Sequence, residues 1–192
     1  MEYDSKQLDV EYQIKLLGVI WTPNCEWDKN TDYLVKKANS RLYFLRRLKN
    51  LGASPKTLKE VYVLFIKSIL ELCAPLWAGN LSKRANKSLT RVEKNAMKII
   101  FPLLSYQESV QKLSFQNLEE RRPVMTRRFA LKMVQNPKFT NLFQKRNGSK
   151  TRSNCKYTVP RTRRNRHKFS PVPVFSKLMN GQTEGVFRYQ IQ

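Results

Sequence analysis

The segment from Ser54 to Ala74, SPKTLKEVYVLFIKSILELCA, constrains the fold of this chain more than any other. Its apolar side chains recur at three- and four-residue steps, which is the period of one face of an α-helix. The members of this stripe are Leu58, Val61, Tyr62, Phe65, Ile66, Ile69, Leu70 and Cys73. The stripe is too wide for a helix that lies on one neighbour, so we expect other helices to cover it on at least two sides.

The ends of this predicted helix carry recognisable signals. The hydroxyl of Ser54 suits the N-cap position, and Pro55 suits the first helical position, where a missing N–H costs nothing. Pro75 should end the helix, because the residue before a proline avoids the α conformation. The helix should therefore have about 20 residues and a length of roughly 30 Å.

The chain carries an unusual excess of positive charge. It has 37 Lys and Arg residues but only 14 Asp and Glu residues, so its formal net charge is +23. A chain this basic repels itself unless a polyanion is near. We expect nucleic acid as that polyanion, with an acidic membrane surface as the rival. No apolar run approaches the ~20 residues of a membrane span, so no membrane partner is expected.

The three cysteines, Cys25, Cys73 and Cys155, are odd in number and far apart. This spacing predicts neither a disulfide framework nor a zinc site, and His167 alone adds no metal signal. We expect Cys73 to be a small core residue. These features fit a reducing intracellular compartment, the nucleus or the cytoplasm.

The rest of the chain predicts a mainly α-helical fold. Thr31–Leu51 forms a first helix with Gly52 at its C-cap, and further helices begin after Ser82, Ser105 and Asn117. Tyr12–Ile20 is a candidate strand without a partner in the chain, which suggests that its sheet lies upstream.

The segment after Pro137 loses this periodicity. Lys145–Lys168 has no acidic residue and few apolar ones, so we expect it to be disordered when alone. Apolar character returns in Ser170–Asn180, which could dock on the helices or form a short terminal turn.

Basic faces recur on the predicted helices without matching carboxylates. Such faces can simply be solvated surface. Their recurrence on several helices favours contact with phosphates, which Lys and Arg neutralise. The residues expected to bind nucleic acid are Arg41, Arg46, Arg47, Lys49, Lys83, Arg84, Arg121, Arg122, Arg127 and Arg128, joined in the tail by Arg161, Arg163, Arg164 and Arg166. The run at 161–168 also fits a nuclear localisation signal.

Aromatic residues give a weaker signal. Tyr43, Tyr62 and Tyr106 could stack on bases, although Tyr62 lies on the core stripe. Trp27 and Trp77 are interpreted as core anchors. No glycine loop for phosphates and no cluster of carboxylates for two Mg²⁺ ions is visible, so no catalytic or metal-binding residue is assigned.

The order of several short motifs resembles the C-terminal part of non-LTR (LINE-like) retrotransposon reverse transcriptases. The motifs are KLLGV at Lys15–Val19, Trp27, RLYFLRRLK at Arg41–Lys49, SILELCAPLW at Ser68–Trp77, LTRVEKNAMKIIFP at Leu89–Pro102, SYQES at Ser105–Ser109, LEERR at Leu118–Arg122, NPKFTNLF at Asn136–Phe143 and the stretch Arg161–Asn180. The catalytic YxDD-type motif of that family is absent from this chain, as is its cysteine–histidine knuckle.

The resemblance implies three parts. Residues 1–28 would be a remnant of the polymerase palm, residues 29–136 a thumb-like helical domain, and residues 137–192 a basic, partly disordered tail. The chain would be a truncated copy that grips RNA, DNA or their hybrid without catalysis. It would need no cofactor, since Mg²⁺ would belong to the missing palm. Two alternatives are a free-standing basic helical protein that binds RNA or DNA and a helical module that presents the Phe65–Ile69 stripe to a protein.

Overall fold

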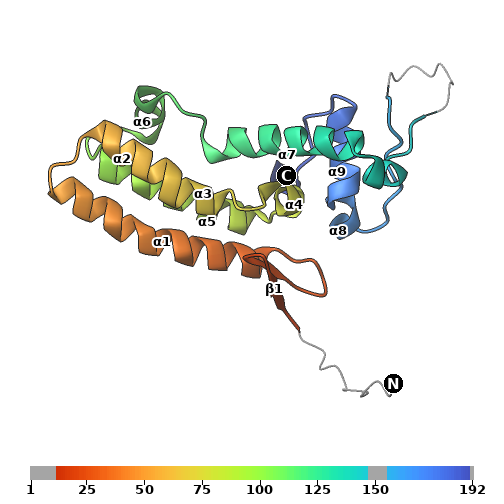
Figure 1. The fold of residues 1–192 in the computed structure, drawn as a ribbon, viewed down its shortest axis with the longest axis horizontal. Coiled ribbons are helices and arrows are strands. Elements are labelled where there is room, and N and C mark those ends of the chain that lie inside the picture. Colours follow the sequence, from red (N-terminus) through yellow and green to blue (C-terminus); the bar gives the residue numbers. More distant parts are fainter. Residues whose placement is uncertain (1–11, 147–154, 191–192) are drawn as a thin grey trace.

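The structure is a computed structural model that describes residues 12–146 and 155–190. It is mainly helical, with one short antiparallel β-hairpin near its N-terminal end (Figure 1). The strands and main helices are β1 (Ile14–Leu16), β2 (Val19–Trp21), α1 (Asp28–Asn50), α2 (Pro55–Val61), α3 (Ser68–Leu70), α4 (Ala74–Trp77), α5 (Lys83–Ile100), α6 (Tyr106–Leu113), α7 (Leu118–Gln135), α8 (Asn165–Lys168) and α9 (Pro171–Met179). The shorter helical turns are η1 (Tyr62–Lys67), η2 (Ala78–Asn80), η3 (Pro137–Leu142) and η4 (Arg188–Gln190).

The predicted lone strand is a complete hairpin. Ile14 pairs with Trp21 and Leu16 with Val19, while Leu17 and Gly18 form the turn with φ of +48° and +82°. Two successive positive φ values are typical of the tight turns whose twist matches that of paired strands. The prediction that the strand lacks a partner in the chain was therefore wrong, because the pairing strand begins after a two-residue turn in the same segment.

Four helices begin where the capping signals predict. The side chain of Ser54 accepts a hydrogen bond from the backbone N–H of Thr57, and Ser82 and Asn117 cap α5 and α7 in the same way. Ser105 and Glu108 form the full capping box of α6. Gly52 follows α1 with φ of +83°, as its predicted role requires. Each cap satisfies backbone groups that a helix end leaves without a partner.

The central helix is not one regular α-helix. After α2, the six residues of η1 form a π-helix, whose turns are wider than α turns. Leu58, Tyr62, Ile66 and Leu70 are all fully buried at strict four-residue steps. In an α-helix such positions drift around the axis, because a turn takes 3.6 residues. The wider turn keeps them in line and leaves Phe65, which the sequence placed in the core, 55% exposed.

The same helix also ends earlier than predicted. It breaks after Leu70, and Cys73 adopts a left-handed conformation with φ of +51° and an exposed side chain. Pro75 therefore lies in the first turn of α4 rather than ending the long helix, and Cys73 is not a core residue. Contrary to the sequence reading, Pro55–Asn80 is long and apolar enough to cross a membrane by length and composition alone. In the structure, part of this stretch forms the core of the bundle.

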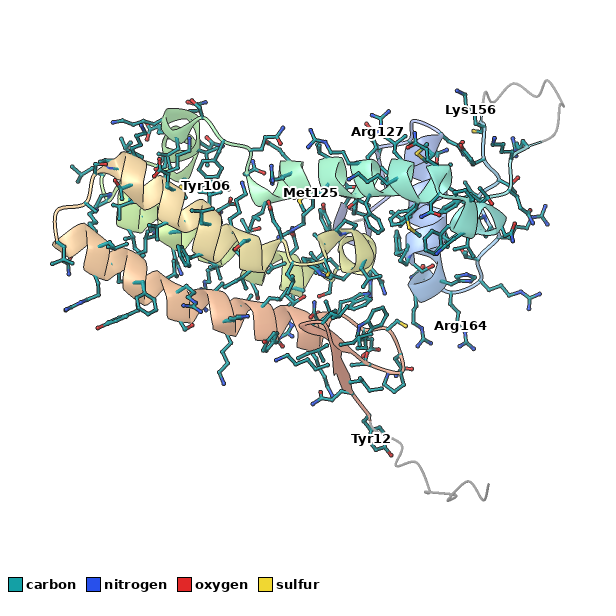
Figure 2. All side chains as sticks on the ribbon, viewed as in Figure 1. Tyr12, Tyr106, Met125, Arg127, Lys156 and Arg164 are labelled. Atoms are coloured by element: carbon teal, nitrogen blue, oxygen red, sulfur yellow. The ribbon has the colours of Figure 1, made fainter. Side chains whose placement is uncertain are left out.

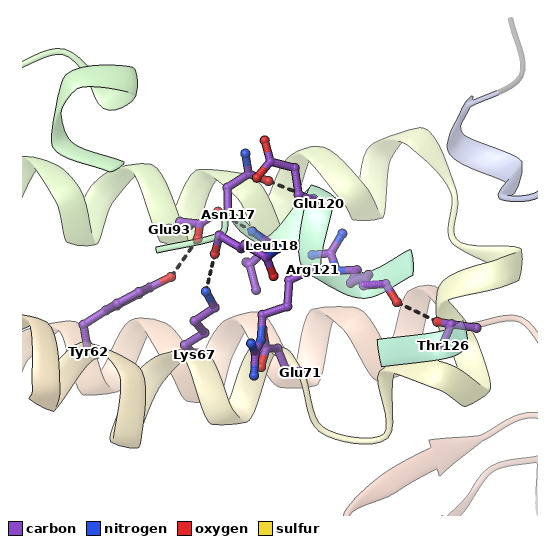
Figure 3. Close-up of polar contacts among 11 residues, drawn as sticks. Tyr62, Lys67, Glu71, Glu93, Asn117, Leu118, Glu120, Arg121 and Thr126 are labelled. Carbon is purple, nitrogen blue, oxygen red and sulfur yellow. Dashed lines mark hydrogen bonds and ion pairs between the residues drawn. The ribbon is translucent and has the colours of Figure 1, made fainter. Parts of the chain in front are cut away.

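A buried carboxylate joins the helices at the centre (Figure 3). Glu93 on α5 is fully buried and accepts hydrogen bonds from the hydroxyls of Tyr62 (3.0 Å) and Tyr106 (2.9 Å) and from the backbone N–H of Leu118 (3.1 Å). These donors belong to η1, α6 and the first residue of α7. Burial and then the negative charge of Glu93 raise the pKa of both tyrosines.

The C-terminal segment packs against the helical bundle. The Phe175 ring of α9 lies 5.8 Å from Phe129 of α7, between ring centroids, and 6.5 Å from Phe143. Gly79 of η2 permits the close approach of the chain before α9, because a Cβ atom there would lie 2.7 Å from the carbonyl oxygen of Phe169. Docking of Ser170–Asn180 on the helices, one of the two outcomes considered from the sequence, is the observed one. The middle of the basic segment, residues 147–154, lies outside the described residues.

The register of η1 can be tested with two neighbouring substitutions. We expect Ile66→Asp to lower the free energy of unfolding by several kcal/mol, because it buries an unpaired carboxylate. Phe65→Asp should change it by less than about 1 kcal/mol, since that side chain is exposed. Urea unfolding followed by circular dichroism measures both. Equal losses would contradict the π-helical register.

The buried tyrosines predict a loss of stability in alkali. Their raised pKa values keep the hydroxyls neutral in the folded state, and burial raises the pKa of Tyr189 to about 12. Unfolded tyrosines ionise near pH 10, so this contribution is complete below pH ~10 and is lost as the pH rises above it. Each such tyrosine should add a slope of about 1.4 kcal/mol per pH unit. Tyr62→Phe should flatten the fall measured by urea unfolding between pH 9 and 12, and the exposed Tyr43→Phe is its control.

Candidate nucleic-acid interface

The arginines and lysines predicted to bind nucleic acid differ widely in exposure. Nine of the fourteen have exposed side chains: Arg46, Arg47, Lys83, Arg84, Arg127, Arg128, Arg161, Arg163 and Arg164. They do not form one surface. In Figure 2, Arg127 extends from the upper side of α7, whereas Arg164 extends below α8. A single flat contact therefore cannot engage the whole predicted set.

Several of the predicted residues are held by protein groups. The ammonium of Lys49 donates to the carbonyls of Ile99 and Ile100, the last residues of α5. Arg84 forms an ion pair with Asp32 at 2.9 Å, and Arg121 forms one with Glu71 at 2.7 Å. These contacts give the three side chains structural roles that the pattern of charges did not indicate.

Arg166 is also held by the protein. Its Nη1 donates to the backbone oxygen of Asn24 (3.0 Å) and to the side-chain oxygen of the same residue (2.9 Å). Asn24 lies in the loop that follows β2. This contact ties the basic C-terminal run to the opposite end of the chain.

Arg122 cannot be a phosphate contact in this fold, because it is fully buried. Its Nη1 donates to the side-chain oxygen of Asn86 at 2.6 Å, and its guanidinium lies 5.9 Å from the centre of the Trp77 ring. Burial lowers the pKa of Arg122. Arg121 and Arg122 were both interpreted as part of a basic helix face, but Arg122 is buried in the core and Arg121 lies at its edge.

One concave site gathers three cations that form no ion pair with a carboxylate of the described residues. A pocket of about 320 Å³ lies where the N-terminus of α5 meets α8 and η4, and its lining is Ser82, Lys83, Asn165, Lys168, Phe169 and Arg188. We call this site the basic pocket. Its three cations come from segments that lie about 80 and 20 residues apart in the sequence. The contact of Phe169 with η2 at Gly79 and the contact of Arg166 with Asn24 bring these segments together.

The polar geometry of the basic pocket favours an anion. Ser82, the N-cap of the 18-residue α5, and Lys83, its first residue, line the pocket, so the partial positive charge of the helix N-terminus adds to the charges of Lys83, Lys168 and Arg188. Behind it, Ser82 donates to a carboxylate oxygen of Asp28 at 2.6 Å while it caps α5. Arg188 uses one nitrogen on the side chain of Asn80 at 3.3 Å, and its side chain is otherwise exposed.

Sequence reasoning identified Lys83 but missed Lys168 and Arg188 as site residues. Lys168 is the last residue of the basic run at 161–168 and was not separated from it. Arg188 stands alone among apolar residues near the C-terminus, where no periodic pattern points to it. Only the docking of the C-terminal segment brings either residue beside α5.

The aromatic residues predicted from the sequence differ in their burial. Trp27, Trp77 and Tyr62 are buried in the core, as predicted. Tyr106 is half-buried against Glu93, whereas Tyr43 is 57% exposed. Within the described ranges, no group of three or more His, Cys, Asp or Glu side chains is arranged to hold a metal ion.

One family model matches part of the chain. It is described as "Alkylated DNA repair protein alkB homolog 8, N-terminal", and it matches residues 27–69. This segment includes α1, α2 and η1 but less than a quarter of the 192 residues. No curated protein and no solved structure matches the chain.

These findings overturn the resemblance to non-LTR retrotransposon reverse transcriptases. The matching model covers RLYFLRRLK, one of the motifs on which that resemblance rested, and it describes a different protein. Short motifs of basic and apolar residues recur wherever amphipathic helices do, so their order was a weak basis for a family. The assignments to a palm remnant, a thumb and a truncated element are withdrawn with it.

A substitution without charge change tests whether the basic pocket depends on the docked C-terminal segment. Gly79→Ala places a methyl group against the backbone of Phe169, so the segment must shift and the pocket should open. We expect limited proteolysis after residue 155 to accelerate while the helix content stays within a few per cent. The wild-type protein is the reference, because the other described glycines, Gly181 among them, adopt positive φ and a Cβ atom there would strain the backbone. Protection of Gly79→Ala equal to that of the wild type would show that the close approach at Gly79 is not required.

Proposed function

We propose that this protein binds nucleic acid through the phosphate backbone, with the basic pocket as the centre of the contact. The observation that carries the proposal is the convergence of Lys83, Lys168 and Arg188 around the N-terminus of α5 in one concave site. A phosphate oxygen is the ligand that such a set of N–H donors and charges recognises. The proposal involves no cofactor and no catalytic step.

Two further observations support nucleic acid over other polyanions. The exposed arginines of α1, α7 and the region around α8 surround the molecule on several sides, which suits an extended ligand that follows its surface. The description of the matching family model concerns the repair of alkylated DNA, which fits a nucleic-acid partner for α1 and η1. With such a partner, we expect the protein in the nucleus or the cytoplasm.

An acidic membrane surface is the second candidate. The apolar stretch Pro55–Asn80 and the high positive charge favour it. Against it, Leu58, Ile66 and Leu70 of that stretch are fully buried in the bundle, although Leu64 and Phe65 are exposed. A concave basic pocket also suits a phosphate that enters it better than a flat layer of head groups.

The salt dependence of binding tests the proposal. Affinity for a 20-nucleotide single strand should fall linearly on a plot of log K against log salt concentration, since each neutralised phosphate releases counterions. Replacing Lys83, Lys168 and Arg188 with Gln should reduce the slope by about 2, at roughly 0.7 per phosphate of a single strand. Fluorescence anisotropy between 50 and 300 mM salt provides the measurement.

A variant with the same charge change is the matched control. Lys36, Lys56 and Lys98 are exposed lysines outside the basic pocket, and replacing them with Gln removes the same three charges. We expect this variant to reduce the slope by less than about 1. Equal slopes for the two triple variants would reject the basic pocket as the centre. Stronger binding to acidic vesicles than to the oligonucleotide would favour the membrane.

A further inference from the structure

A second concave site lies between α1 and η1, away from the basic pocket. It has a volume of about 330 Å³ and is lined by Arg41, Phe44, Arg47, Leu48, Val61 and Phe65. We call it the aromatic groove. Its lining is mostly apolar, and it contains no carboxylate.

The two rings of the aromatic groove are open to solvent. Phe44 is 54% exposed and Phe65 is 55% exposed. The neighbouring Tyr43, also 57% exposed, lies edge-on to Phe44 with 5.9 Å between ring centroids. Exposed aromatic rings gathered at one hollow are unusual on a protein surface and mark a place where a ligand binds.

The backbone explains why these rings face outward. The π-helical turn of η1 aligns Tyr62 and Ile66 with the core, which rotates Phe65 to the outer side. On α1, Leu42 and Leu45 are fully buried, so Phe44 between them lies off the buried stripe. Both rings are therefore held on rigid helices, and neither is needed to fill the core.

Positive charge borders the same groove. The guanidinium of Arg41 lies 5.8 Å from the centre of the Phe44 ring, and Arg47 lies one turn away from that ring on the same helix. A ligand that inserts a flat apolar group between the rings will thus meet two cations at its edges. A nucleobase with a phosphate on either side has this distribution of apolar face and negative charge.

We propose that the aromatic groove binds one unpaired base of a single-stranded nucleic acid, with Phe44 and Phe65 as stacking surfaces and Arg41 and Arg47 as contacts to the flanking phosphates. This inference rests on the proposed function and adds a preference to it. Duplex phosphates can reach the basic pocket, but the paired bases of a duplex cannot enter the groove. The protein should therefore bind single strands more tightly than duplexes of the same length.

An acidic amphipathic helix from a protein partner is the alternative occupant. Such a helix lays a row of apolar anchors over two or more turns into a long groove. The aromatic groove is instead short, since six residues line it and Arg41 and Arg47 lie at its polar edge. Its volume and its two neighbouring cations suit a single ring system better than a row of side chains.

One nucleic-acid strand can occupy both the basic pocket and the aromatic groove. Asp28, which accepts the hydrogen bond of Ser82 beside the basic pocket, and Phe44 are 16 positions apart on α1. At a rise of 1.5 Å per residue, this separation is about 24 Å. An oligonucleotide must exceed this length to occupy both sites, so affinity should rise steeply once it can span them.

The decisive variants replace each ring with leucine, which keeps the apolar surface but removes the π-face. We expect Phe44→Leu and Phe65→Leu each to weaken binding of a 20-nucleotide single strand by about 5- to 150-fold, the range of one base–aromatic stack. Phe65→Trp should restore or exceed wild-type affinity, and its fluorescence should be quenched by the strand. Tyr12→Leu removes an exposed ring outside the groove and should leave affinity unchanged.

The failure of this inference differs from the failure of the proposed function. Duplex affinity should stay within twofold of wild type in both leucine variants, because the basic pocket is intact. If the leucine variants bind single strands as tightly as wild type does, the groove does not stack a base, although nucleic-acid binding through the basic pocket stands. If wild type binds neither single strands nor duplexes, both proposals are wrong.

Discussion

The fold depends on a carboxylate that has no cation within hydrogen-bonding distance among the residues that the structure describes. Glu93 is buried between the helices, and two tyrosine hydroxyls and the N–H of Leu118 satisfy its oxygens. A buried charge is costly unless donors surround it, so the helices that carry those donors must meet at this point. The position of α7 relative to α5 follows from this constraint. The α9 helix packs on α7, so the placement of the C-terminal segment depends on it as well.

Local chemistry made much of the fold predictable from the sequence. The caps at Ser54, Ser82, Ser105 and Asn117 each act within three residues, and short-range hydrogen bonds of this kind can be recognised without knowing the tertiary fold. The π-helix could not be recognised in this way. A stripe with three- and four-residue steps fits an α-helix equally well, and only packing against Glu93 and α1 selects the wider turn.

The candidate sites were harder to predict, because they depend on contacts between distant segments. A basic residue on an amphipathic helix has the same local pattern whether it faces solvent, as Arg127 does, or an interior amide, as Arg122 does. Lys168 and Arg188 become neighbours of Lys83 only through the docking of the C-terminal segment. The sequence contains the aromatic residues of the groove, but it gives no sign of the helix rotation that exposes Phe65 to solvent.

The basic pocket is assembled from three separate parts of the chain, and this has a thermodynamic consequence. Lys83 belongs to the helical bundle, whereas Lys168 and Arg188 belong to the segment that docks against it through Gly79 and Phe169. Any anion that binds all three cations binds only the docked arrangement, so occupancy and docking stabilise each other by the same free energy. Binding of a polyanion, as proposed, would therefore couple its concentration to the order of the C-terminal segment.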